Sequence, residues 1–438
     1  MTSLVGTRAE GATALPTHHD PARSREQTVV LVAVVAIGLV VVRALDDAFL
    51  QPAPGLGPGD HLLGGLVPVV VGAVAAAVVR RTRRGFRSWA TLLAGVWGLV
   101  GSMELFLERG PRAGLQADDV SAALSLVAGV VLLGAFGFFA SVSPSRGRNR
   151  ATRSLRRVAT AVGLVLATYA VALPLGVAYY ATHYSGEGIM TAPDLDAPVE
   201  HVEFESSDGL RLTGWYVPTQ NGAAVLIHPG RSGLDHARLL ARHGYGVLLL
   251  NRRGEADSEG ETDLFGWADT RDIAGAAEFL RSQEGIAPDA IGGVGLSVGG
   301  EVLLEHASLS DDLAGVVVEG IGSRSIKESV HLSGGMRLAE LSTAPLMTGG
   351  LVVLTDQAPP PDLVDAAAGL APSRALIIWG EDGQPGEKVL GPTYAEAAGA
   401  AATWWEVPDA RHTRAIDAAP EEYERRVIAF FDATLLHR

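Results

Sequence analysis

The residues best suited to chemistry surround Ser297, at the centre of Gly295-Leu296-Ser297-Val298-Gly299. An apolar run typical of a short strand precedes this serine, and a run typical of a helix follows it. A serine on a sharp strand-to-helix turn exposes its hydroxyl, and flanking glycines let the two backbones approach each other. The pattern therefore predicts a nucleophile whose oxygen shares a space with the N–H of the next residue.

The elements that must position this serine alternate between apolar strands and amphipathic helices. A hairpin is predicted at 202–217, around the turn Ser207-Asp208-Gly209. Further strands are predicted at 223–227, 246–250, 291–295, 314–318, 375–379 and 403–407, with helices at 270–283, 301–309 and 420–435. This alternation predicts a mainly parallel sheet with helices on both faces.

Four motifs in this region resemble the α/β-hydrolase family in order and spacing. They are His228-Pro229-Gly230, the stretch from Asn251 to Gly260, the turn at Ser297, and the late histidine loop at 408–413. The likeness covers roughly residues 200–435. It is strongest to the membrane-anchored serine esterase and peptidase-like branch, although Asn251 replaces the usual Asp and Pro229 the usual Gly.

The resemblance implies a catalytic triad in which Ser297 is the nucleophile. The general base is implied to be a histidine after the last strand, and His412 fits that place. The other histidines considered are less well placed: His306 is on the helix after the serine, His331 in an insertion, and His228 in the oxyanion loop.

The resemblance places the triad acid after the strand predicted at 375–379, where Glu381, Asp382 and Glu387 lie. Asp382 is favoured, because aspartate is the commoner residue type there and it follows the strand closely. Glu387 is the alternative, because the intervening loop, rich in glycine and proline, could fold it back toward the base.

The resemblance also implies an oxyanion hole made of two backbone N–H groups, from Val298 and from Gly230, with Arg231 as the alternative second donor. The Arg231 side chain is predicted either to meet an anionic substrate or to pair with Asp235. No metal and no organic cofactor is implied.

The composition indicates that part of the chain lies in lipid. Hydrophobic residues make up 47% and charged residues only 19% of the 438 residues, and the mean hydropathy is +0.22. The net charge of −14 argues against a nucleic-acid partner, which requires a basic face. The absence of cysteine from the sequence excludes disulfides, cysteine nucleophiles and thiolate metal sites.

Five apolar stretches predict a bundle of five transmembrane helices, at 28–42, 62–79, 88–106, 120–142 and 158–180. Arginine concentrates in the second and fourth loops, at 80–87 and 146–157, whereas acidic residues mark the other two. Because positively charged loops stay in the cytoplasm, the N-terminus is predicted inside the cell and everything after residue 183 outside it.

The predicted organisation is a cytoplasmic tail (1–27), the bundle (28–182), a linker (183–199) and an α/β-hydrolase domain (200–438). Residues 323–372 form an insertion where this family builds a lid. An apolar lid near a bilayer would suit acyl or lipid-like substrates, and a structural cap is an equal alternative.

The leading hypothesis is a membrane-anchored serine hydrolase that cleaves an ester, thioester or small amide through an acyl-serine intermediate. A peptidase of the same fold is the second hypothesis, because it would share the nucleophile and the base. The third is a non-catalytic binding or sensing domain on a membrane bundle. The sequence leaves the substrate and the oligomeric state open.

Overall fold

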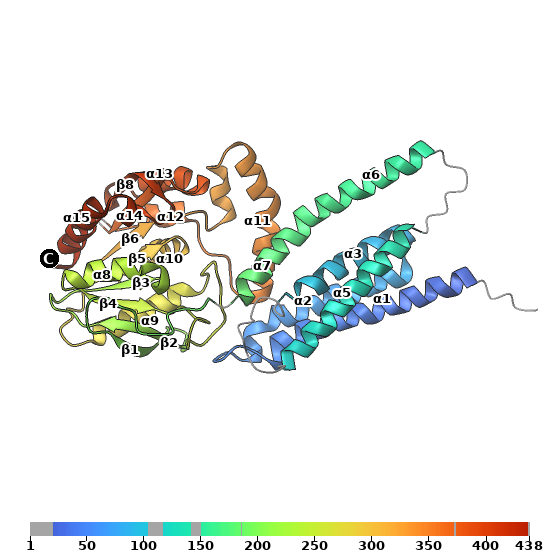
Figure 1. Ribbon diagram of the computed structural model, residues 1–438, viewed down its shortest axis with the longest axis horizontal. Coiled ribbons are helices and arrows are strands. Elements are labelled where there is room, and N and C mark those ends of the chain that lie inside the picture. The colour runs from blue at the N-terminus through green and yellow to red at the C-terminus, as the bar shows by residue number, and fades with distance from the viewer. Residues whose placement is uncertain (1–20, 104–116, 142–149, 185, 372–373, 437–438) are drawn as a thin grey trace, which may run out of the picture.

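The computed structural model describes residues 21–103, 117–141, 150–184, 186–371 and 374–436. An α/β unit lies at one end of a group of long helices (Figure 1). Predictions that concern the first 20 residues, residues 104–106 and residue 142 fall outside the described part of the chain.

One eight-stranded sheet organises the α/β unit. Its strands are β1 (Glu200–Glu205), β2 (Arg211–Val217), β3 (Ala224–His228), β4 (Gly246–Leu250), β5 (Ile291–Leu296), β6 (Gly315–Glu319), β7 (Ala375–Asp382) and β8 (Ala402–Arg411). They lie in the order β1-β2-β4-β3-β5-β6-β7-β8. The pairs made by β1 with β2 and by β2 with β4 are antiparallel, and the remaining neighbours are parallel. The predicted hairpin and mainly parallel sheet are therefore confirmed.

Helices cover both faces of this sheet, as the apolar strands require. Residues of α9 (Asp269–Ser282), α10 (Val298–Leu309), α12 (Leu363–Ala368) and α13 (Pro385–Ala398) share one apolar core with the sheet. Residues of α8 (Leu234–Arg242) and α15 (Pro420–Phe431) share the core on the other face. The central strands β3, β4, β5 and β6 are fully buried.

The long helices are α1 (Pro21–Leu45), α2 (Leu62–Arg81), α3 (Arg84–Val100), α5 (Ala117–Ser141), α6 (Arg150–Ala167) and α7 (Leu173–His183). A short π-helix at Thr168–Ala172 joins the last two. Each predicted apolar stretch is helical where it is described, except at residues 101–103. Helix α3 ends at Val100, before the predicted end of its stretch, because Gly101 begins a turn.

Five of the described helices are long and apolar enough to cross a membrane by length and composition: Arg23–Leu50, Pro58–Arg81, Asp119–Ser141, Ala161–His183 and Gly334–Thr355. The last of these was not among the predicted spans, and the predicted span at 88–106, which is described as far as residue 103, is not one of the five. The helix that was not predicted is α11, which lies inside the predicted lid between β6 and β7. The sequence indicates only separate apolar pieces here, because Pro345 and the Gly349-Gly350 pair interrupt the run.

Several contacts connect the helices to the α/β unit. His61 faces Glu261 at 3.4 Å, and the N–H of Leu264 donates to the carbonyl oxygen of Ala181 at 2.9 Å. Next to this junction, His183 contacts the Asp47 carboxylate at 2.9 Å. The α/β unit thus contacts the start of α2 and the end of α7.

Candidate active site

The backbone at Ser297 has the geometry of a strained turn. Its φ is +54° and its ψ is −123°, which a non-glycine residue adopts only when the surroundings impose it. Glycine is required on both sides, because a Cβ at Gly295 would lie 2.4 Å from the Gly299 carbonyl oxygen and one at Gly299 would lie 1.9 Å from that of His228. The turn therefore presents the Ser297 hydroxyl between β5 and α10.

His412 lies between Ser297 and Glu387. Its Nε2 is 3.0 Å from Ser297 Oγ, and its Nδ1 is 2.8 Å from Glu387 Oε2. The histidine follows the end of β8, 115 residues after the serine in the chain. An imidazole in this position can accept the serine proton at Nε2 while the carboxylate holds its Nδ1–H.

The structure corrects the preferred carboxylate. Asp382 is the last residue of β7, pairs in register with Arg411 and is exposed to solvent, so it does not reach the imidazole. Glu387 lies in the first turn of α13 and is 1% exposed. Its carboxylate accepts the N–H groups of Gly380, at 3.0 Å, and Gln384, at 3.1 Å. These bonds fold the side chain back toward the histidine, so the alternative acid is the one that meets His412.

These partners also determine how Glu387 titrates. Burial alone would raise the pKa of this carboxyl, but the hydrogen bonds from His412, Gly380 and Gln384 outweigh burial and hold its pKa below the ordinary 4.5. A depressed carboxyl pKa contributes stability above the ordinary value, and that stability is lost as the pH falls through the lower folded value.

We therefore expect the thermal stability advantage of the wild-type protein over Glu387→Gln to shrink as the pH is lowered from neutral to below the ordinary carboxyl pKa of 4.5, because protonation removes the charge that the native partners stabilise. Unfolding temperatures of both proteins in the same detergent, measured across this range, check the prediction. An advantage that stays constant over the range would contradict it.

The two predicted oxyanion donors lie in adjacent segments. Val298 is the first residue of α10, so its N–H is at the start of that helix. Gly230 and Arg231 begin the 3₁₀ turn that follows β3. Because β3 and β5 are parallel neighbours, with His228 opposite Gly295, this turn lies beside the serine turn. The structure leaves both Gly230 and Arg231 as candidates for the second N–H.

The Arg231 side chain does not pair with Asp235. Its guanidinium donates to Glu187 at 2.6 Å and is 57% exposed, whereas Asp235 pairs with Arg238 at 2.7 Å. Glu187 belongs to the segment before β1, a partner that the local sequence around Arg231 could not indicate.

Comparison with known proteins agrees with this architecture. Residues 170–419, more than half of the chain, match the model of the X-Pro dipeptidyl-peptidase (S15) family. The chain belongs to this family.

Individual relatives match over shorter regions. A thiohydrolase of Aspergillus aculeatus, aneE, is 32% identical over 127 residues, which is 27% of this chain and 40% of that protein. An uncharacterised protein of Mycobacterium tuberculosis is 37% identical over 109 residues, 23% of this chain and 38% of that protein. The chain thus spans about two fifths of the curated relatives that it matches. A solved esterase of Pyrococcus furiosus is 20% identical, with 55% of this chain and 93% of that chain covered and a TM-score of 0.43.

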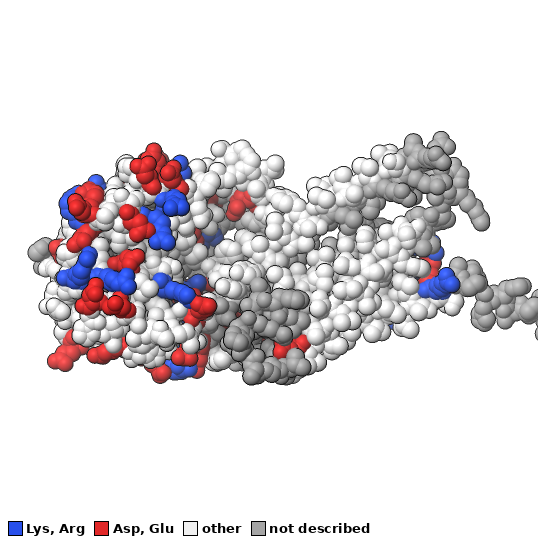
Figure 2. Space-filling model, in the orientation of Figure 1, with Lys and Arg blue, Asp and Glu red and all other residues white. Residues whose placement is uncertain are grey.

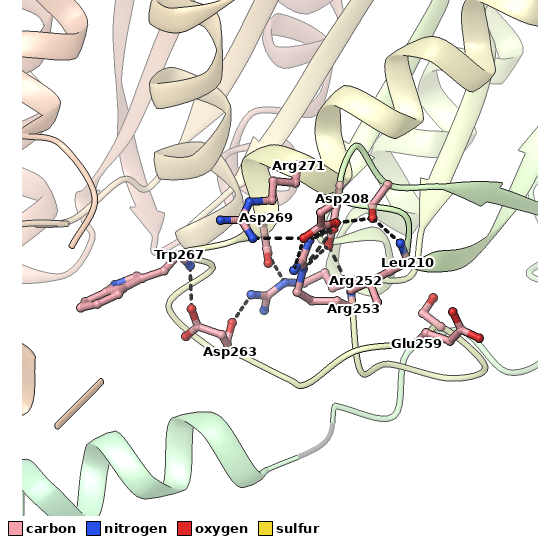
Figure 3. Close-up of polar contacts among 12 residues, drawn as sticks. Asp208, Leu210, Arg252, Arg253, Glu259, Asp263, Trp267, Asp269 and Arg271 are labelled. Atoms are coloured by element: carbon pink, nitrogen blue, oxygen red, sulfur yellow. Dashed lines mark hydrogen bonds and ion pairs between the residues drawn. The ribbon is translucent and has the colours of Figure 1, made fainter. Parts of the chain in front are cut away.

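In this S15 family member, a buried ionic network supports the turn after β3. His228 Nε2 lies 2.9 Å from Asp269 Oδ2, and the same carboxylate accepts from Arg252 Nε at 2.6 Å. Arg252 also donates to the backbone carbonyl of Asp263, and Arg253 pairs with Asp208 (Figure 3). Arg253 pairs with Asp272 as well. Arg252 lies in the segment after β4 that resembles the hydrolase family. Through Asp269, this segment stabilises His228 at the end of β3 and so the turn that follows it.

We expect Asp269→Asn to destabilise the protein by about 3–5 kcal/mol, because it leaves the buried Arg252 cation without its partner. Asp269 is 0% and Arg252 is 6% exposed. The control is Asp235→Asn, whose exposed pair with Arg238 should be worth about 1 kcal/mol or less. Urea or thermal unfolding of both variants in detergent checks the prediction, and equal effects would contradict it.

A hollow lies between α10, the helix that follows the Ser297 turn, and α11. Its volume is about 410 Å³ including space open to solvent. Its walls come from α10, from α11 and from the loops at 265–267 and 323–326; they include Glu301, Trp267, Ala344, Met347 and Leu351. Glu301 lies one helical turn after Ser297, since its N–H donates to the Ser297 carbonyl oxygen at 3.2 Å. Glu301 was not predicted from the sequence, although its place in the first helical turn after Ser297 is visible there.

Proposed function

We propose that this protein is a membrane-anchored serine hydrolase that cleaves an ester, a thioester or a small amide through an acyl-serine intermediate. The observation that carries the proposal is the continuous row of contacts from Ser297 through His412 to Glu387, at 3.0 and 2.8 Å. A row of this kind at a strained strand-to-helix turn is the arrangement that activates a serine.

In the proposed reaction, Ser297 Oγ attacks the substrate carbonyl carbon while His412 Nε2 takes the hydroxyl proton. The N–H of Val298 and one from Gly230 or Arg231 stabilise the resulting oxyanion. Collapse of this intermediate breaks the bond to the leaving group, which departs with the proton from His412. Water then attacks the acyl-serine, with His412 again accepting a proton, and the acid product and free Ser297 are regenerated.

The preferred substrates are esters and thioesters, and the peptidase alternative is supported by the description of the matching family. The name of the Aspergillus aculeatus relative supports a thioester. A panel of acyl esters, acyl thioesters and short peptide amides, tested on the full-length protein, separates the three. Labelling of Ser297 by a fluorophosphonate tests the proposal as a whole, and no labelling of well-folded protein would leave the non-catalytic alternative.

The anchoring part of the proposal is supported by where the apolar surface lies. Exposed large apolar side chains concentrate on α1, α2, α3, α5, α6 and α7, with Val70, Val74, Val127 and Val165 among them, each at least 58% exposed. Figure 2 shows charged side chains gathered over the α/β unit, while the middle of the bundle carries none on the face in view. A surface of this kind is unfavourable in water and suits lipid. We propose a bundle at 28–182 that spans the cell membrane and an extracytoplasmic hydrolase domain at 200–438.

We expect a tag placed after Arg438 to react with an impermeant reagent in intact cells. A tag placed before Met1 should react only after permeabilisation, because five crossings put the two ends on opposite sides. A C-terminal tag that is reached only from inside the cell would refute this topology.

A further inference from the structure

The lid helix α11 has two distinct faces. Among the described residues beyond 183, eight large apolar side chains are exposed, and three of them, Leu338, Leu341 and Leu346, lie on this helix. They are 71%, 44% and 36% exposed. The opposite stripe, Glu340, Ala344, Met347 and Leu351, follows helical spacing and lines the hollow beside α10.

Contacts with the candidate spans determine where α11 lies. The Leu63 N–H, in the first turn of α2, donates to the Asp356 carboxylate at 3.0 Å. Gly350 packs on α7, because a Cβ there would lie 3.1 Å from the Ala178 Cβ. Farther toward the start of α11, Ser342 Oγ lies 3.3 Å from the Tyr169 hydroxyl.

These contacts place the leucine face at the level of the bilayer. Leu63 begins the apolar part of α2, so Asp356 lies at the predicted outer boundary of the hydrocarbon region. Tyr169 lies well inside the apolar run Ala161–His183. Because Ser342 contacts Tyr169, the part of α11 around Ser342 lies deeper in the predicted membrane than Asp356 does. Figure 1 shows α11 between the α/β unit and the line of α7 and α6, which diverges from the other long helices. Leu338 and Leu341 therefore face the region that lipid would occupy, whereas the less exposed Leu346 lies on the stripe between Ser342 and Gly350 that packs against the Tyr169 and Ala178 segment.

We propose that α11 is an interfacial lid whose leucine face lies in the outer leaflet, and that the hydrolase takes its substrate, a membrane-borne amphiphilic ester, thioester or amide, from that leaflet into the hollow beneath α11. The proposal rests on the proposed function for the reaction itself. The placement of α11 in lipid does not require an active Ser297. The partner is the lipid bilayer, because the same helices that hold α11 carry the exposed apolar surface.

The test of placement uses the absence of cysteine from the sequence. Leu338→Cys and Leu341→Cys are each labelled with an environment-sensitive fluorophore in full-length protein reconstituted into phosphatidylcholine nanodiscs. Leu309→Cys is the matched control, because Leu309 is 70% exposed but ends α10 in the α/β unit. Lipids with a nitroxide on the acyl chain should quench the labels at 338 and 341 strongly and the label at 309 weakly.

Two results would overturn the placement. Equal lipid quenching at 338 and 309 would mean that α11 does not enter the bilayer. Protection at 338 from both the lipid nitroxide and aqueous iodide would mean that protein, such as a second copy of this chain, covers the leucine face. Fluorophosphonate labelling of the same samples reports the state of Ser297 separately, so a failure of the proposed function is distinguished from a failure of the lid placement.

The test of substrate route compares a long-chain ester held in the nanodisc with a short soluble ester. In the double variant Leu338→Glu/Leu341→Glu, the ratio of the two rates should fall at least about tenfold, because charged side chains withdraw the helix from the acyl region. Leu309→Glu should keep the ratio within about twofold of the wild type. Uptake beneath α11 would be overturned if lipid quenches the label of Leu338→Cys, so that α11 does lie in the bilayer, and yet the double glutamate variant keeps the wild-type ratio of rates.

Discussion

Replacement of Ser297 by alanine should abolish fluorophosphonate labelling and lower the hydrolysis rate by about 10⁶-fold. The reagent reacts only with an activated hydroxyl, and the 3.0 Å contact with His412 Nε2 is the only described contact of Ser297 Oγ that can accept its proton. The loss should appear in kcat rather than in substrate binding, because the substituted atom acts in the transition state.

The control for this variant is Ser282→Ala. Ser282 is exposed at the end of α9. The one hydrogen bond that its hydroxyl is described as donating goes to the Phe279 carbonyl oxygen of the same helix. It should keep full labelling and full activity. Persistent labelling of folded Ser297→Ala would show that another residue is the nucleophile.

Glu387→Gln should lower kcat by about 10⁴-fold while the protein stays folded. The amide keeps the shape of the side chain and can still accept the Gly380 N–H, but it no longer supplies the negative charge that stabilises the His412 imidazolium. An amide N–H in place of a carboxylate oxygen also favours the wrong tautomer of the imidazole.

Asp382→Asn is the matched control, because it makes the same chemical change five residues away, at an exposed position with no described contact to His412. It should change kcat by less than about twofold. The reverse result, a large loss in Asp382→Asn and a small one in Glu387→Gln, would make Asp382 the functional acid and refute the role proposed for Glu387. Thermal unfolding of both variants separates loss of activity from loss of fold.

The sheet was predictable because its signals are local. Short apolar runs, the Asp208-Gly209 turn and the glycines around Ser297 each depend on neighbouring residues, so strand periodicity and turn chemistry reveal them directly. The positions of β4 and β5 agree with the predicted strands to within one residue. The S15 family match then covers the same part of the chain.

The triad acid could not be chosen in this way, because the choice depends on which carboxylate the fold brings next to His412. Asp382 is nearer to the predicted strand, but β7 continues through it and leaves it exposed at the end of that strand. Glu387 reaches His412 because α13 begins at Pro385 and returns the chain over Gly380. Neither fact is contained in residue type or in distance along the sequence.

The sequence by itself therefore determined the fold class and the serine at the strand-to-helix turn, since periodicity and turn-forming residues specify these features over a few residues. The histidine after the last strand came from the resemblance to the α/β-hydrolase family. Only the tertiary structure decided which carboxylate meets His412, that Arg231 pairs with Glu187, and that the insertion between β6 and β7 contains α11 packed against α7. Each of these depends on segments far apart in the chain, whose approach is set by packing of the whole core rather than by any local pattern.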